Sequence, residues 1–197
     1  SDWSSDVCSS DLIISGIDDG SKNTEMTIKM LEMAEESGTT DIVATPHFMR
    51  GRFEVTYKEV IDEVENLKKL TKENSININI YSGQEVYYSR NILEYYNQGM
   101  IGTINNTRYM LIEFPMLEFN IEEAINTLYE LQIRGIVPII AHPERYKQFI
   151  KNPSQINLLI KEGMLFQVNA GSINGDFVRD VKKTAIKYLN NNIYSFI

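Results

Sequence analysis

Cysteine is almost absent from this 197-residue chain, and its scarcity indicates where the protein works. The single cysteine, Cys8, has no second thiol to pair with, so no internal disulfide can form. A chain without disulfides is typical of reducing compartments, and the expected location is the cytoplasm. No run of about 18 apolar residues occurs either, which excludes a membrane-spanning helix and predicts no insertion into a membrane.

Positive charge is also in short supply. The chain has 19 lysine and arginine residues against 27 aspartate and glutamate residues, and its formal net charge is −8. Proteins that bind nucleic acid or anionic membranes in general need a dominant positive field. The composition therefore excludes those classes of protein and leaves room only for a small basic pocket.

The first twelve residues differ in composition from the rest of the chain. They consist mostly of serine and aspartate, and they contain the only tryptophan, Trp3, together with Cys8. They lack the basic start and the apolar stretch that a secretion signal requires. We expect residues 1–12 to be foreign to the gene or a disordered N-terminal segment, with no part in the fold, and residues 13–197 to form one domain.

Residues 13–197 alternate between helical and extended patterns. The expected helices span residues 24–37, 60–70, 89–97, 120–134, 153–161 and 178–190, and the expected strands span residues 41–45, 76–83, 108–114, 136–141, 164–169 and 193–197. Such alternation predicts an α/β fold with a parallel sheet. A doubly wound sheet and a (β/α) barrel both fit it. Polar residues at the end of nearly every strand favour the barrel.

Four of those strand-end residues are candidate metal ligands. The only two histidines, His47 and His142, each follow an apolar run and each lie beside a proline. Glu85 follows an isoleucine-rich strand, and Glu113 lies within an otherwise apolar run, where an unpaired carboxylate would be costly. The alternatives are structural roles for the histidines, a surface loop for Glu85 and a buried ion pair for Glu113.

A turn rich in carboxylates, at residues 16–20, adds Asp18 and Asp19 to this group. Imidazoles and carboxylates together suit Mn²⁺, Zn²⁺ or iron better than Ca²⁺. Hydrolases that use two metals hold the ions about 3.5–4 Å apart between such ligands. The sequence therefore predicts a metal centre at the strand ends.

Three arginines follow the two histidines closely. Arg145 comes three residues after His142, where its guanidinium could bind the oxygens of a phosphate group. Arg50 and Arg52 follow His47 and are either substrate-binding groups or solvated surface. The chain has no Cys-x5-Arg or Gly-x-Ser-x-Gly motif that would supply a protein nucleophile. Hydrolysis would therefore use metal-activated water to attack phosphorus.

Six ordered motifs resemble those of the PHP-domain (polymerase and histidinol phosphatase type) protein-tyrosine phosphatases of bacterial capsule and exopolysaccharide loci. They are GIDDG at 16–20, ATPH at 44–47, GQE at 83–85, LIEFP at 111–115, AHPERY at 141–146 and QVNAGS at 167–172. The resemblance covers residues 13–197, as a PHP phosphatase domain. It implies a distorted (β/α)7 barrel, incomplete at its first and last strands.

The resemblance also implies a cofactor, a partner and site residues. The cofactor is manganese, as two or three ions, with zinc or iron as alternatives. The partner is a bacterial tyrosine kinase that controls polysaccharide synthesis, and its phosphotyrosine tail is the substrate. Matched motif by motif, Arg145 lies near the phosphate and is catalytic together with Glu113. The implied metal ligands are Asp19, His47, Glu85, Glu113 and His142.

Two departures from the family pattern bear on activity. Members carry His-x-His before the acidic turn, where this chain has Ser10 and Leu12, and Asp-x-His after the strand expected at 193–197. With these four ligands absent, we expect the chain to be a fragment that is itself less active or inactive. The alternatives are a phosphatase for a small ester such as histidinol phosphate, or an inactive domain that only binds its partner. Self-association into a homo-oligomer is compatible with either.

Overall fold

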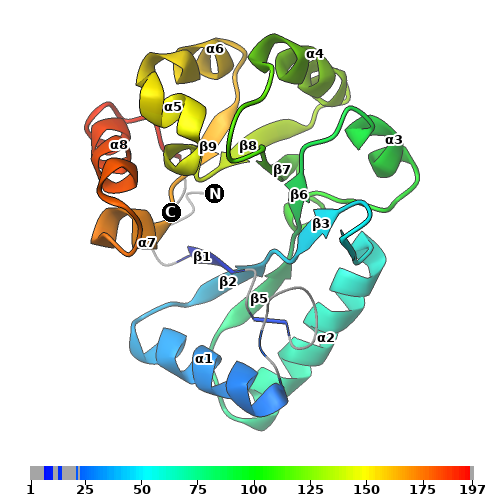
Figure 1. Cartoon of the computed structure of the whole chain (residues 1–197). Coiled ribbons are helices and arrows are strands. Elements are labelled where there is room, and N and C mark those ends of the chain that lie inside the picture. The colour runs from blue at the N-terminus through cyan, green and yellow to red at the C-terminus, as the bar shows by residue number, and fades with distance from the viewer. Residues whose placement is uncertain (1–6, 11–12, 15–20, 22, 196–197) are drawn as a thin grey trace. The chain divides into compact units, whose positions relative to one another are not determined.

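The computed structural model describes residues 7–10, 13–14, 21 and 23–195, which fall into two compact units (Figure 1). Unit 1 comprises Ser1–Val86 and Tyr95–Thr107, and unit 2 comprises Tyr87–Glu94 and Arg108–Ile197. Each unit combines parallel strands with the helices that connect them, so the predicted α/β class is confirmed. A closed barrel stays a prediction.

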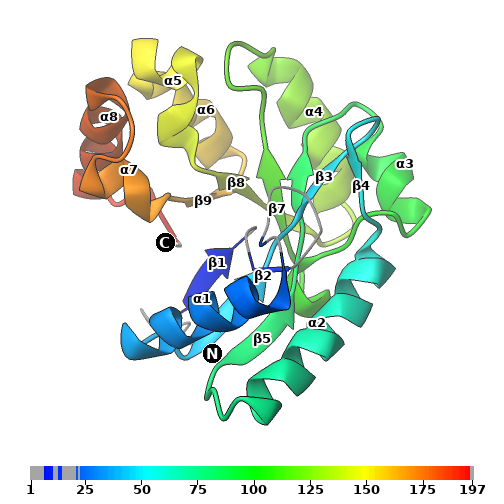
Figure 2. The same ribbon diagram turned by 60° about the horizontal axis from the view of Figure 1, so that its bottom comes forward.

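The sheet of unit 1 has three parallel strands, in the order β1 (Val7–Ser10), β2 (Asp41–Ala44) and β5 (Asn79–Ser82). Helices α1 (Thr24–Glu36) and α2 (Tyr57–Glu73) run along this sheet, as Figure 2 shows. Both helices contribute their apolar stripe to one core cluster with the strands, so they pack on the same face. Burial of that stripe stabilises the two helices more than their intrinsic propensity does.

A second group of strands in unit 1 follows the ends of β2 and β5. Strand β3 (His47–Met49) pairs antiparallel with β4 (Phe53–Glu54) and parallel with β6 (Glu85–Tyr87). The last residue of β6 already belongs to unit 2. The short helix α3 (Ile92–Asn97) and the 3-10 turn η1 (Ile104–Asn106) come next in the chain.

Unit 2 is built on three parallel strands that are neighbours in chain order. They are β7 (Tyr109–Glu113), β8 (Val137–Ala141) and β9 (Leu165–Gln167). Helix α4 (Ile121–Gln132) connects the first two strands. The second connection contains η2 (Pro143–Arg145), α5 (Lys147–Lys151), η3 (Pro153–Gln155) and α6 (Ile156–Lys161). After β9 the chain forms α7 (Ala170–Asn174) and α8 (Arg179–Asn190).

Every helix expected from the sequence is present, and five of the six expected strands are confirmed with shifted ends. The strand expected to begin at residue 76 begins at Asn79, because its partner strand β2 begins at Asp41, which pairs with Asn79. Ile76 and Ile78 precede the strand and lie in the core with α1 and α2. No helix among the described residues is long and apolar enough to cross a membrane.

The strand expected at 193–197 is wrong for residues 193–195, and residues 196–197 lie outside the described part of the chain. Asn192 has a left-handed backbone (φ 52°) and ends α8 in a turn, in which the Ile193 amide donates to Tyr188 O. Ser195 then donates a backbone hydrogen bond of 2.8 Å to Phe166 O of β9. The β-branched pattern alone did not reveal this turn.

Residues 7–10 form a strand, although the composition of residues 1–12 predicts none. The backbone of Val7–Ser10 pairs with β2 in the register Val7↔Asp41. Pairing of this kind uses backbone groups, so a serine-rich sequence can adopt it next to a well-formed strand. That residues 1–12 are foreign to the gene stays a prediction.

Candidate metal centre

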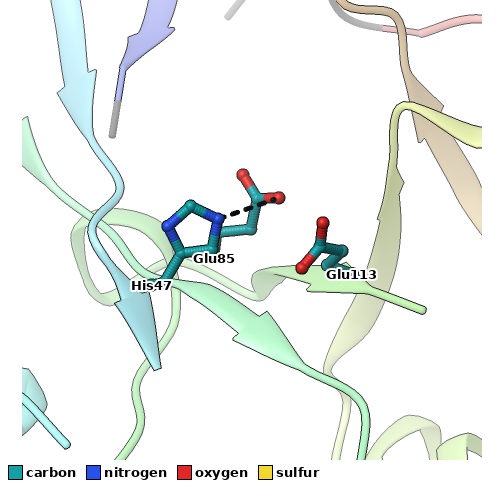
Figure 3. A group of neighbouring side chains, drawn as sticks. All are labelled: His47, Glu85 and Glu113. Carbon is teal, nitrogen blue, oxygen red and sulfur yellow. Dashed lines mark ion pairs between the residues drawn. The ribbon is translucent and has the colours of Figure 1, made fainter. Parts of the chain in front are cut away.

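His47 and Glu85 form an imidazole–carboxylate pair in unit 1. They are the first residues of β3 and β6, and the parallel register places them opposite each other. His47 Nε2 lies 3.9 Å from Glu85 Oε1, the contact drawn as a dashed line in Figure 3. Both side chains are largely withdrawn from solvent, with 20% and 10% of their surface exposed. Strand register therefore brings together two residues that are 38 positions apart.

The backbone around Glu85 is held by the two residues before it. A Cβ on Gly83 would lie 2.9 Å from Val43 Cγ1, so only glycine allows the chain to pass this close to β2. The buried Gln84 side chain donates to Val55 O at 2.8 Å and accepts from the Gly102 amide at 2.9 Å. The Glu85 amide donates to Pro46 O at 3.0 Å. The GQE motif is therefore a rigid support for the carboxylate.

Glu113 and His142 form a second pair, in unit 2. Glu113 is the last residue of β7, and His142 directly follows β8. His142 Nε2 lies 3.4 Å from Glu113 Oε1, and the two side chains expose 6% and 10% of their surface. Carboxylates and imidazoles are usually exposed to solvent, so a pair this deeply buried is unusual.

The backbone of His142 is left-handed, with φ 31° and ψ 57°. Few residues other than glycine adopt this region, which costs about 1–3 kcal/mol and persists only where the surroundings impose it. Pro143 follows at once and begins η2, in which the Arg145 amide donates to His142 O at 3.0 Å. This turn directs the chain away from β8 and leaves the imidazole beside Glu113.

The pKa of Tyr87, in unit 2, depends on the charge of Glu113. Its burial, and then the negative charge of Glu113, raise the pKa of the Tyr87 hydroxyl above its usual value of 10.0.

The two pairs suit a divalent cation. Mn²⁺, Zn²⁺ and iron bind mixed sets of imidazole and carboxylate ligands. Ligand bonds of about 2.0–2.2 Å to nitrogen and oxygen are usual for zinc, so one ion can touch two atoms separated by up to about 4.2 Å. The separations of 3.9 Å and 3.4 Å both fall within that limit. The donor set therefore fits a metal of this class.

The three arginines have different surroundings. Arg145 is half-buried in η2, and its guanidinium lies 4.9 Å from the ring centre of Phe177. Arg52 stacks on Phe53 at 4.8 Å, and that ring centre is 6.0 Å from the ring of His47. Arg50 forms an exposed ion pair of 2.7 Å with Glu54. Among the residues that the structure describes, Arg50 is the one of these three arginines with an ion pair to a carboxylate.

One predicted ligand, Asp19, lies outside the described residues. Two residues of the AHPERY motif have structural contacts that the sequence did not reveal. Tyr146 is buried, and its hydroxyl bonds to the backbone beside Glu113 and His142. Glu144 is fully buried and accepts hydrogen bonds from the Asn169 amide and the Tyr194 hydroxyl, both 3.0 Å. The signal in the sequence that could have indicated these contacts is the position of Glu144 and Tyr146, a charged and an aromatic residue, directly after a strand end.

Comparison with known proteins identifies the family of this chain. The family model for capsular polysaccharide synthesis proteins CpsB/CapC matches residues 6–197. The chain is 38% identical to the putative tyrosine-protein phosphatase CapC of Staphylococcus aureus, over 94% of this chain and 72% of that protein. It is 29% identical to the tyrosine-protein phosphatase YwqE of Bacillus subtilis (strain 168), with the same coverage.

A solved structure shares the fold. It comes from crystal structures of YwqE from Bacillus subtilis and CpsB from Streptococcus pneumoniae, described as unique metal-dependent tyrosine phosphatases. The match has a TM-score of 0.88 at 28% identity and covers 95% of this chain and 76% of the other. Taken with the family match over residues 6–197, this shows that the chain belongs to the CpsB/CapC family of capsular polysaccharide synthesis proteins.

Proposed function

We propose that this protein is a metal-dependent tyrosine-protein phosphatase of capsular polysaccharide synthesis. The observation that carries the proposal is the presence of two imidazole–carboxylate pairs at strand ends that are largely withdrawn from solvent, His47 with Glu85 and Glu113 with His142. Relatives named tyrosine-protein phosphatases, and the metal dependence of the structural match, support the same activity. The substrate class is phosphotyrosine in a protein.

The proposal treats the two pairs as parts of one metal centre. In the proposal, the side chains of His47, Glu85 and Glu113, which Figure 3 draws, bind the same cation. His142 would complete the set through its 3.4 Å contact with Glu113. Asp19 is proposed as a fifth ligand on the family resemblance alone.

Each group has a distinct part in the proposed reaction. A bound divalent cation supplies Lewis acidity, which polarises phosphoryl oxygens and lowers the pKa of water at the site. Glu113 supplies negative charge that balances the cations, which makes it a catalytic residue. Arg145 binds the non-bridging phosphate oxygens, and its stacking on Phe177 limits the orientations of its guanidinium. Arg52 would bind the peptide near His47. Arg50 would do so as well once its ion pair with Glu54 is broken.

The finer parts of the proposal concern metal, partner and compartment. Manganese is the proposed metal, as two or three ions, and zinc or iron are the alternatives with the same ligand preference. The proposed substrate is the phosphotyrosine tail of a tyrosine kinase that controls capsule or exopolysaccharide synthesis, in the cytoplasm.

The experiment is phosphate release from a phosphotyrosyl peptide by the chelator-treated protein. We expect no release until Mn²⁺ is added, and slower release from the same peptide carrying phosphoserine. Histidinol phosphate tests the alternative substrate class in parallel. Mn²⁺-independent release, or a preference for histidinol phosphate, would contradict the proposal. Binding of the phosphopeptide without release would indicate an inactive binding domain.

A further inference from the structure

We infer that Tyr146 is a positioning residue, whose hydroxyl holds the ends of β7 and β8 so that Glu113 and His142 meet the metal in the right place. The inference rests on the proposed function, because it assigns Glu113 and His142 to a metal centre. It concerns a side chain that touches neither the proposed metal nor the substrate.

The Tyr146 hydroxyl bonds to both strands at once. It donates to Ala141 O of β8 at 2.6 Å, and it accepts from the amide of Phe114 at 3.0 Å. Phe114 directly follows Glu113, and Ala141 directly precedes His142. A tyrosine hydroxyl has one donor and can accept in addition, so these two bonds use it in both capacities. The two proposed ligands are therefore each one peptide unit from the same hydroxyl.

The hydroxyl lies where the strand pairing stops. The register of β7 and β8 runs from Tyr109↔Val137 to Ile112↔Ile140. Beyond the last of these pairs, a bridge through Tyr146 joins Phe114 to Ala141 in place of a direct strand-to-strand bond. On its other side Ala141 still pairs with Gln167 of β9, so the bridge attaches the end of β7 to a strand that is already held in the sheet. The bridge thus extends the order of the sheet to the residues that flank the proposed ligands.

Packing keeps the Tyr146 ring in one orientation. The residue is fully buried, and its ring contacts Phe114, Phe119 and Phe149 at centroid distances of 6.1, 6.0 and 5.8 Å. It also meets the imidazole of His142 edge-on at 5.7 Å. A ring confined on these sides presents its hydroxyl at a constant position. Tyr146 therefore constrains His142 both through its ring and through its hydroxyl.

The test is Tyr146→Phe, which removes the hydroxyl and leaves the ring in place. A matched control exists in Tyr188→Phe, because Tyr188 is also buried and donates to a backbone carbonyl, Pro153 O at 3.1 Å. Tyr146→Phe loses the two hydrogen bonds of its hydroxyl and Tyr188→Phe loses one, so both variants should have a lower melting temperature. Affinity for Mn²⁺ alone, measured by calorimetry, and amide hydrogen exchange of Phe114 are then compared.

We expect Tyr146→Phe to weaken Mn²⁺ binding about 10–100-fold, the usual cost of losing a group that orients metal ligands. Tyr188→Phe should bind Mn²⁺ as the unmodified protein does. The Phe114 amide should exchange faster in Tyr146→Phe and not in Tyr188→Phe. Unchanged Mn²⁺ affinity in Tyr146→Phe, or an equal loss in Tyr188→Phe, would overturn the inference.

Failure of the proposed function is distinguishable from failure of this inference. If the unmodified protein binds no Mn²⁺, the proposed metal centre is wrong, and the exchange data alone decide the role of Tyr146. Faster exchange at Phe114 only in Tyr146→Phe would keep Tyr146 as the residue that orders the two strand ends. Equal exchange in both variants would remove that role as well.

Discussion

Glu113 is the single residue whose charge matters most to the proposed centre. Its carboxylate is buried at the end of β7 and lies 3.4 Å from His142. Glu113→Gln preserves the side-chain volume and removes the negative charge that a cation requires. We expect a larger loss of Mn²⁺ affinity than the roughly 10–100-fold that follows loss of an orienting group, and a comparable loss of phosphatase activity. Metal content after dialysis and release of phosphate from a phosphotyrosyl peptide measure the two effects.

Glu118→Gln is the control for this substitution. Glu118 lies five residues further along the chain, is 73% exposed and pairs with Lys151 at 3.1 Å. Exposed ion pairs contribute about 0–1 kcal/mol to stability, so this variant should fold and bind Mn²⁺ as the unmodified protein does. Full metal content and full activity in Glu113→Gln would instead identify Glu113 as a structural acid.

Strands β2 and β5 are joined by a carboxylate as well as by their backbones. Asp41, the first residue of β2, accepts hydrogen bonds from the side chains of Thr40, Tyr81 and Asn79 at 2.6, 3.0 and 3.1 Å. The hydrogen bond from Thr40 is the largest cause that lowers the pKa of Asp41 below its usual 3.8, and those from Tyr81 and Asn79 act in the same direction. The folded state consequently favours the charged form of Asp41.

This lowered pKa predicts how the stability of the strand pair changes with pH. A depressed carboxyl pKa stabilises the folded state above the unfolded value of about 3.9, and the contribution is lost as the pH falls through the folded pKa. Asp41→Asn should therefore lower the free energy of unfolding at neutral pH, and the difference from the unmodified protein should shrink in acid. Urea unfolding at about pH 7 and about pH 3 measures it. Asp62→Asn, at an exposed position of α2, is the control for removal of a charge. A difference that stays constant with pH would refute the role of Asp41.

Metal binding should stabilise the whole molecule. A ligand that binds only the folded state adds about 2.7 kcal/mol to stability when it is present at 100 times its dissociation constant. The proposed ligands come from both compact units, Glu85 from unit 1 and Glu113 from unit 2. Mn²⁺ should therefore raise the melting temperature, and Glu85→Gln or Glu113→Gln alone should remove most of the increase. If each variant kept about half of the increase in melting temperature, the His47–Glu85 pair and the Glu113–His142 pair would be separate metal sites.

Much of this protein could be predicted from its sequence because the signals are local. Apolar residues at helical spacing predicted α1, α2, α4 and α8, and short apolar runs predicted β2, β7 and β8 close to their observed ends. Errors occurred where a neighbour decided the conformation. Val7–Ser10 is a strand because β2 lies beside it, and Ile193–Ser195 is not one because the turn at Asn192 redirects the chain.

For the candidate site, the sequence by itself determined which residues could bind a metal, since both histidines and two glutamates stand at the ends of apolar strands. Only the tertiary structure decided how they combine. The register of β3 with β6 pairs His47 with Glu85, and the ends of β7 and β8 pair Glu113 with His142. Register depends on how whole strands align, and a contact such as that of Tyr146 with Phe114 spans 32 residues. The spacing of residues along the chain does not show which strand-end residues will face each other, because only the folded arrangement of the strands brings them together.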